Sequence, residues 1–435
     1  MDGDIAWLLA PLALIYAVVF WVVSLRFPSV PLALILGLAP FQNDISDFGG
    51  LHFSVSEVHL LLSVPLLYRR VGRLHWGWMG GVLASALAIT VLLTVPNWRD
   101  TSTLSLVQMG LYWIGAVLLF TNLPRSSKDF AMAWKTLMAV GCGLAVMAVV
   151  TGSSYFWGLN KNGIGASLAC TLMVTTELWL CANDSQRWKY LPVLVLVSAA
   201  LVLVLSRGAW ISALAGLSFI LLWRSQYLLL AKLALAAIPV VAAVWMVLPE
   251  ESRDYALAID DSRYNIHART LNADFARDQW LSSPFIGVGV GLRKEYDATN
   301  ILWLTLAETG PVGLMAFLTV NGALVIGVWH RRPKKASFTR DSSAIALAGG
   351  LVLGKLVHGL VDHYWSRGAI MIAWASVGMA LSVEGRAHFP RTLTRISKQK
   401  KERSAPNEEF LHRISSLSCP VKVVGKKTEF LTKDG

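Results

Sequence analysis

Charged residues are scarce in this sequence. Asp, Glu, Lys and Arg together make up 15% of its 435 residues, while hydrophobic residues make up 55% and the mean hydropathy is +0.53. Soluble domains carry about 25% charged residues. The composition therefore excludes an ordinary soluble enzyme and indicates a polytopic membrane protein.

Cysteine is also scarce, and its few copies are scattered. The four cysteines are Cys142, Cys170, Cys181 and Cys419. Three of them lie in apolar segments, and no two have the CxxC spacing. A disulfide framework or a structural zinc site needs closer, paired spacing. We therefore expect these cysteines to be packing residues and predict no metal site.

Acidic residues are fewer than basic residues, with 27 Asp and Glu against 39 Lys and Arg, which gives a net charge of +12. The excess Lys and Arg residues gather in short connectors, such as 68–73 and 330–335, and in the tail from Arg386 onward. This distribution is typical of the cytoplasmic loops of a membrane protein, where positive charge sets the orientation. We therefore expect no nucleic-acid partner.

Long apolar runs are what the sequence has in abundance. Because a spanning helix needs about 20 apolar residues, they predict an all-α polytopic integral membrane protein with about 12–13 transmembrane helices. The first run lacks a basic flank and a cleavage site, so we expect a retained span. Two of the expected spans, 29–42 and 55–68, are short, and half-helices or a re-entrant pair are the alternatives for them. The other expected spans are 5–25, 76–95, 104–122, 130–151, 163–182, 190–205, 208–223, 227–248, 311–329, 342–362 and 367–383.

The basic connectors give the expected orientation. They all fall on one side of the predicted spans, which we assign to the cytoplasm. Residues 1–383 then form the membrane domain, and residues 384–435 form a basic cytoplasmic tail that is disordered or lies along anionic membrane lipids. One long loop, 249–310, falls on the outer side, and loops of this length are usually functional or disordered.

The outer loop contains a predicted helix. The stretch NIHARTLNADFARDQWL, residues 265–281, places Leu271 and Phe275 on one stripe and Arg269 and Arg277 on another. The sequence therefore predicts an arginine-bearing helix outside the spans.

Glycines follow this helix at alternate positions. They are Gly287, Gly289 and Gly291. Their spacing does not fit the GxGxxG turn, so flexible backbone packing at the membrane surface is favoured over nucleotide binding. Gly310 and Pro311 then break a helix. A short interfacial helix is expected at 300–309, with Glu308 at the outer boundary of the membrane.

Several polar residues lie at the expected outer ends of the spans. Arg207 interrupts an apolar stretch, and an arginine there either faces a partner or extends toward the headgroups. Gly208 is expected to permit the turn between two helices. Ser-Arg-Gly-Ala recurs later in the chain with Arg367. Lys161 and Asn162 begin another span, where the helix N-terminus favours an anion, although anchoring at headgroups is the alternative.

One span carries three ionisable residues on a single face. Lys355, His358 and Asp362 lie at positions i, i+3 and i+7. Ionisable groups within a span usually face a cavity or one another. The pattern predicts a polar cavity, with a Lys–Asp pair that holds helices together as the alternative.

The order of these motifs resembles that of the O-antigen ligase and polymerase family. The resemblance covers about residues 155–383 and rests on the following stretches: NKNGIGASLA, LSRGAW, the arginine-bearing loop helix, SPFIGVGVG, TNILWLTLAETGPVGL and HGLVDHYW. No single motif is specific, whereas their order on one side of a polytopic chain is.

The resemblance implies a bacterial inner-membrane glycosyltransferase. Such enzymes move a glycan from an undecaprenyl-diphosphate carrier to a lipid A-core sugar, a polysaccharide or a protein on the outer face, without metal or other cofactor. It implies that Arg207 and Arg269 bind the carrier diphosphate, because a guanidinium fork forms bidentate bonds with phosphate oxygens. We add Arg277, Lys161, Asn162, Asn300 and Arg367 as substrate-binding residues, and His358, Asp362 and Glu308 as catalytic residues.

This sequence departs from the family at one position. The family usually has His directly before Asn300, where this chain has Thr299, and Thr is no base at neutral pH. Either another histidine replaces it, or leaving-group stabilisation suffices, or the activity is altered. We favour the first, with His358 and Asp362 as base and orienting residue. The outer histidines are His267, His358 and His363.

A transporter is the competing class. A flippase for lipid-linked glycan or a carrier of small anions would have repeated halves and a site at the membrane midplane. The visible repeat is only four residues long, and the informative charges gather at the expected outer boundary. The pattern therefore favours surface chemistry over transport, and a structural scaffold would not explain the paired arginines.

Overall fold

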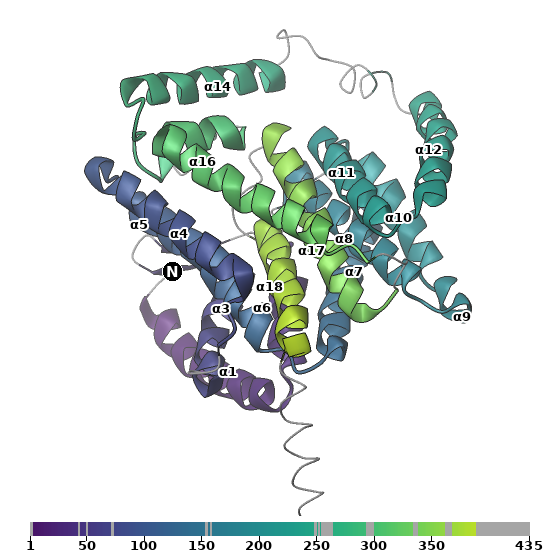
Figure 1. Ribbon diagram of the computed structural model, residues 1–435, viewed down its shortest axis with the longest axis horizontal. Helices are drawn as coiled ribbons and strands as arrows, with labels where there is room; N and C mark the ends of the chain where they lie inside the picture. Colours follow the sequence, from purple (N-terminus) through teal and green to yellow (C-terminus); the bar gives the residue numbers. More distant parts are fainter. Residues whose placement is uncertain are drawn as a thin grey trace, which may run out of the picture. The chain divides into compact units, whose positions relative to one another are not determined.

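The computed structural model describes residues 3–41, 44–48, 51–70, 74–152, 155–156, 159–247, 250, 253, 264–292, 300–333, 338–361 and 368–388. The chain divides into two units, Met1–Gly385 and Arg386–Gly435. The features below belong to the first unit, whose helices Figure 1 labels. The first residues of the predicted tail, 384–388, are helical and end α18, whereas the rest of the tail lies outside the described ranges.

The described chain is helical throughout apart from one short hairpin. Its first helices are α1 (Gly3–Arg26), α2 (Ser29–Leu38), α3 (Val55–Ser63), α4 (Gly77–Thr94), α5 (Ser102–Gly110), α6 (Val117–Asn122) and α7 (Ser127–Thr151). Those that follow are α8 (Lys161–Leu180), α9 (Asp184–Arg187), α10 (Leu191–Leu203), α11 (Arg207–Trp223), α12 (Tyr227–Val247), α14 (Tyr264–Ser282), α16 (Ile301–His330), α17 (Arg340–Val361) and α18 (Gly368–His388). Two 3-10 segments, η1 (Val64–Arg70) and η2 (Val95–Asn97), extend α3 and α4, and the π-helix η3 (Leu111–Ala116) joins α5 to α6.

Six helical segments of the described chain are long and apolar enough to cross a membrane. They are Gly77–Asn97, Ser102–Asn122, Ser127–Thr151, Lys161–Leu180, Ile301–His330 and Arg340–Val361. This confirms the predicted all-α polytopic membrane class. Seven further apolar helical stretches are 10–17 residues long, and three of them are parts of the longer helices α1, α12 and α18. Between α10 and α11, for example, Leu205 has a φ of 55° and ends the helix before it reaches full length.

A two-stranded hairpin separates the two shortest predicted spans, and sequence reasoning missed it. Strand β1 (Asp44–Phe48) pairs antiparallel with β2 (Leu51–Ser54). Ser54 caps α3, and its backbone N–H donates to the Glu57 carboxylate at 2.6 Å. Helix α2 packs on α3, so these two short helices form a pair, as the short apolar runs indicated.

Glycines bring α8, α11 and α17 into close contact (Figure 1). A Cβ atom on Gly216 would lie 2.7 Å from the backbone oxygen of Gly350, and one on Gly354 would lie 2.9 Å from that of Ser212. Lipid tails are as apolar as the helix side chains, so the hydrophobic effect does not drive helices together within a membrane. Small residues let the helices approach closely and gain packing contacts instead. The tight packing buries α8 and fixes its ends against those of α11 and α17.

Helix α14 confirms the helix predicted in the long loop and lies next to α16 (Figure 1). The Trp280 ring of α14 packs near Trp303 of α16, with 6.4 Å between centroids. The predicted break in α16 is also present, because Gly310 has a φ of 63° and a ψ of −171°. The helix nevertheless continues to His330 beyond this kink.

Candidate functional site

The turn between α10 and α11 holds Arg207 at the first position of α11. The left-handed residue of this turn is Leu205, so the expectation that Gly208 makes the turn was wrong. The Ser206 hydroxyl donates to the Asn162 amide oxygen at 3.1 Å. This bond joins the start of α11 to the start of α8, and Asn162 thereby positions the arginine turn.

His358 of α17 packs directly against this turn. It is fully buried, and a Cβ atom on Gly208 would lie 2.7 Å from its Cδ2 atom and 2.9 Å from its Nε2 atom. Glycine is therefore required at 208 to make room for the imidazole. Because Arg207 precedes Gly208, the predicted arginine and histidine lie at one end of the bundle, which we call the Arg207 end.

Two further cations act on His358. Lys355 lies one helical turn before it in α17 and is also buried. The charges of Lys355 and Arg269 both interact with the His358 ring. Arg269 belongs to α14, far from α17 in the sequence. We call Arg207, Arg269, Lys355 and His358 the cationic cluster; its members come from the arginine turn, the loop helix and α17.

Asn300 links the start of α16 to the same end of the bundle. Its side-chain oxygen accepts from the backbone N–H groups of Leu302 at 2.9 Å and Trp303 at 3.3 Å. Its side-chain nitrogen donates to the Leu360 carbonyl at 2.9 Å. Leu360 lies two residues after His358, so Asn300 positions α16 next to the cationic cluster.

We expect Asn300→Ala to lower the thermal unfolding midpoint of the detergent-purified protein. Loss of a helix N-cap costs about 1 kcal/mol, and the lost bond to Leu360 adds about 1 kcal/mol. Asn300→Asp retains the capping oxygen but not the nitrogen that donates to Leu360, so its unfolding midpoint should fall by less than that of Asn300→Ala. Asn183 begins α9 without a side-chain capping bond. A similar loss in Asn183→Ala would show that the three side-chain bonds of Asn300 are unimportant.

The remaining predicted residues lie further along α14, at the start of α8, or outside the described chain. Arg277 lies about two turns along α14 from Arg269 and is exposed. Lys161 begins α8 beside Asn162. The predicted partners Asp362 and Arg367, like Thr299, lie outside the described residues.

Glu308 lines a cavity inside the protein, while its expected place at the outer membrane boundary stays a prediction. It is buried, and its carboxylate accepts from the Gly291 backbone N–H at 2.9 Å. The cavity and the solvent-filled space at its mouth together have an empty volume of about 640 Å³. The lining residues are Thr90, Ser105, Gln108, Met109, Tyr112, Trp113, Val290, Ile301, Thr305, Glu308, Thr309, Gly313, Phe317, Ile370 and Trp374. Ser105, Gln108 and Tyr112 repeat the i, i+3, i+7 pattern seen in α17. That signal was present in the sequence and was overlooked.

The alternate glycines form one wall of this region. The backbone N–H groups of Val288 and Gly289 donate to the carbonyls of Ala307 and Glu308 at 2.8 and 2.9 Å. A Cβ atom on Gly289 would lie 2.0 Å from the Asn97 carbonyl oxygen, and its φ is 88°. The glycines thus permit close backbone packing against the α16 kink.

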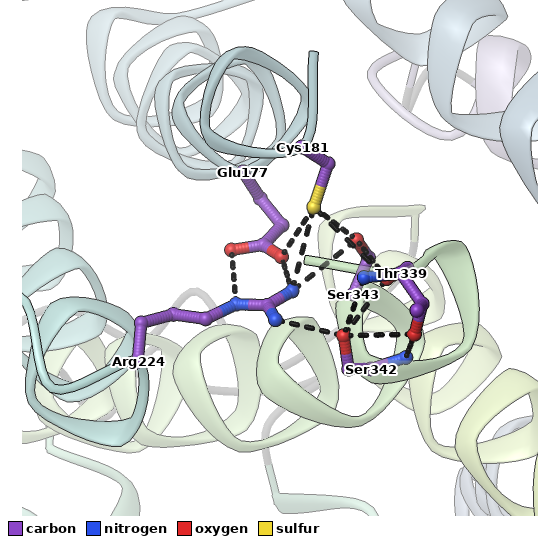
Figure 2. A network of polar contacts seen from close by, with 6 residues as sticks. All are labelled: Glu177, Cys181, Arg224, Thr339, Ser342 and Ser343. Atoms are coloured by element: carbon purple, nitrogen blue, oxygen red, sulfur yellow. Dashed lines mark hydrogen bonds and ion pairs between the residues drawn. The ribbon is translucent and has the colours of Figure 1, made fainter. Parts of the chain in front are cut away.

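The opposite end of α11 holds a buried ion pair that sequence reasoning missed. Arg224 and Glu177 are both 0% exposed, and the guanidinium Nε atom donates to the carboxylate at 3.4 Å while Nη2 forms a second bond. Figure 2 shows how Cys181, Ser342 and Ser343 complete the network. Arg224 donates to Ser342 at 2.7 Å, and Ser343 contacts the Cys181 thiol at 3.0 Å. The network ties α8 and α11 to α17.

A metal site is not assembled within the described part of the chain. There, no group of three or more His, Cys, Asp or Glu side chains is placed to hold a metal ion. Independence from metal and other cofactors stays a prediction.

Comparisons with known proteins assign no family. No family model matches the sequence, and no curated protein matches it. The solved structure of a peptidoglycan synthase complex, described for the coordination of polymerization and crosslinking, contains a similar chain. The similarity covers 72% of this chain and 98% of that chain, with a TM-score of 0.44 and 18% identity. The resemblance to the O-antigen ligase family therefore rests on the sequence motifs alone.

Proposed function

We propose that this protein is a glycosyltransferase of the bacterial plasma membrane. It transfers a glycan from an undecaprenyl-diphosphate carrier to a sugar or lipid acceptor, such as lipid A-core, on the outer face. The observation that carries the proposal is the cationic cluster, in which charges from α14 and α17 act on one buried histidine beside Arg207.

The cluster has the chemistry that a diphosphate leaving group needs. Negative charge develops on the phosphate oxygen as the bond to the anomeric carbon breaks. Fixed guanidinium groups stabilise this charge more strongly in a water-poor site than in bulk water. Arg207 and Arg269 supply such groups from two different segments, so they bind the diphosphate together.

The acceptor completes an inverting reaction. Its hydroxyl oxygen attacks the anomeric carbon from the face opposite the diphosphate, and the electron pair of the broken bond goes to the phosphate oxygen. The acceptor proton passes to a base, for which His358 is the nearest candidate. Asp362 is proposed to orient this ring, while Lys161 and Arg367 add positive charge to the donor site. The mechanism requires only positioning, charge stabilisation and one proton transfer.

Reconstitution in liposomes tests the proposal against the transporter alternative. The purified protein is supplied with lipid-linked glycan and lipid A-core extracted from a polysaccharide-producing bacterium. We expect a new glycosidic linkage and one released undecaprenyl diphosphate per linkage, detected by mass spectrometry. Movement of the carrier across the bilayer without a linkage would overturn the proposal and support a flippase.

A further inference from the structure

The Glu308 cavity differs in chemistry from the cationic cluster. None of its described lining residues is Lys, Arg or His. Its polar lining carries one carboxylate, one amide and several hydroxyl groups, and its apolar lining includes the rings of Trp113, Phe317 and Trp374. An anion is disfavoured here because Glu308 lines the cavity and no basic side chain balances it.

Two donors in this lining are unsatisfied. The Ser105 hydroxyl and the Trp374 indole nitrogen have no hydrogen-bond partner within the described part of the chain. Their residues are only 3% and 1% exposed. Buried polar groups without a partner cost about 1–3 kcal/mol each. Both residues line the cavity, where the hydroxyl groups of a ligand would offer them acceptors.

Groups behind the cavity lining hold its polar side chains in place. The Tyr112 hydroxyl donates to the buried Glu57 carboxylate, and the Gln108 amide reaches it at 3.4 Å. Glu308 is fixed by the Gly291 backbone N–H at 2.9 Å. Anchored side chains of this kind are pre-organised for recognition.

The aromatic residues narrow the ligand class. The Trp113 and Trp374 rings lie 6.0 Å apart with an interplanar angle of 60°. A sugar ring has hydroxyl groups that both donate and accept, and it has an apolar face suited to such rings. A purely apolar ligand would leave Ser105 and Trp374 unsatisfied. A neutral saccharide therefore fits both the polar and the apolar side chains of the lining.

We infer that the Glu308 cavity is a binding subsite for a neutral sugar ring of the acceptor glycan. The identification of this sugar as part of the acceptor rests on the proposed function. The cavity begins at Ile301, directly after Asn300, which positions α16 next to the cationic cluster. Glu308 lies about 12 Å further along α16, at 1.5 Å per residue. The sugar therefore sits beside the donor site.

Saturation-transfer NMR on the protein in nanodiscs tests the subsite without requiring transfer activity. The probes are the methyl glycosides of glucose, galactose, rhamnose and N-acetylglucosamine. We expect at least one to bind the wild-type protein, and its Kd to rise about three- to tenfold in Trp374→Phe and in Ser105→Ala, since each loses one hydrogen bond.

Two matched variants control for packing changes. Trp134 and Ser212 also carry buried, unsatisfied donors within the described chain, yet neither lines the cavity. Trp134→Phe and Ser212→Ala should leave the Kd unchanged. Equal weakening in the controls, or no binding of any probe to the wild type, would overturn the subsite.

The outcome also separates the subsite from the proposed function. Arg207→Ala should retain sugar binding, because Arg207 does not line the cavity. Sugar binding without glycan transfer would contradict the glycosyltransferase proposal alone. Transfer activity without sugar binding, or with unchanged binding in Trp374→Phe and Ser105→Ala, would contradict the subsite alone.

Discussion

Replacement of Arg207 by alanine should lower glycan transfer by about 100- to 1000-fold in the reconstituted system. Loss of one fixed donor to a developing oxyanion costs roughly this factor in other enzymes. The effect is expected to be large because Arg207 begins α11 beside the buried His358, and a fixed charge next to the protein interior is poorly replaced by solvent.

Substitution by lysine separates charge from geometry. Arg207→Lys keeps the charge but loses the bidentate fork that matches a diphosphate, so an intermediate rate is expected. Arg269→Ala should show a loss of similar size to Arg207→Ala. The double variant should lose less than the product of the two factors, because both residues act on one leaving group.

An arginine at the other end of the bundle provides the control. Arg187 is 41% exposed and pairs with Asp184 at 3.1 Å, close to the end of α8. Arg187→Ala should transfer glycan at the wild-type rate. Wild-type transfer by Arg207→Ala, with intact folding shown by size-exclusion chromatography, would remove Arg207 from the donor site.

Elements with a local signal were predictable from the sequence. Apolar runs located the helices, the spacing of Phe275 and its neighbours located α14, and Gly310 with Pro311 located the kink in α16. Each of these depends on residues within a few turns of one another. The hairpin at 44–54 had only part of such a signal: its sequence contains a typical turn pair, Gly49-Gly50, but the flanking residues include few β-branched ones and were not recognised as strands.

Contacts between distant segments were less predictable. The sequence marked Arg207 and His358 separately, but only packing through Gly208 brings them together. Gly208 itself was misassigned, because a glycine beside a turn looks the same whether it makes the turn or receives a side chain. Arg224 directly follows the expected span 208–223 and looks like any other basic residue of a connector, since nothing local reveals that Glu177, 47 positions away, meets it in the protein interior.

Breaking the Glu177–Arg224 pair should destabilise the protein more than any other single change considered above. Both side chains are fully buried, and removal of one partner leaves an uncompensated charge, which costs about 3–5 kcal/mol. Arg224→Ala and Glu177→Ala should each sharply lower the midpoint of SDS-induced unfolding in mixed micelles. The Arg224 guanidinium also lies 5.3 Å from the centroid of the Trp223 ring and 5.4 Å from that of Phe338, so its loss removes packing as well.

A double replacement distinguishes an uncompensated charge from lost packing. Glu177→Leu combined with Arg224→Met removes both charges and keeps most of the volume, and such replacements are often neutral or stabilising. The double variant should therefore unfold nearer to the wild type than either alanine variant. Asp184→Ala breaks the exposed pair with Arg187 and should cost less than about 1 kcal/mol. A double variant as unstable as Arg224→Ala would show that the network of Figure 2, including Ser342 and Cys181, stabilises the helix ends through its hydrogen bonds and not through charge balance alone.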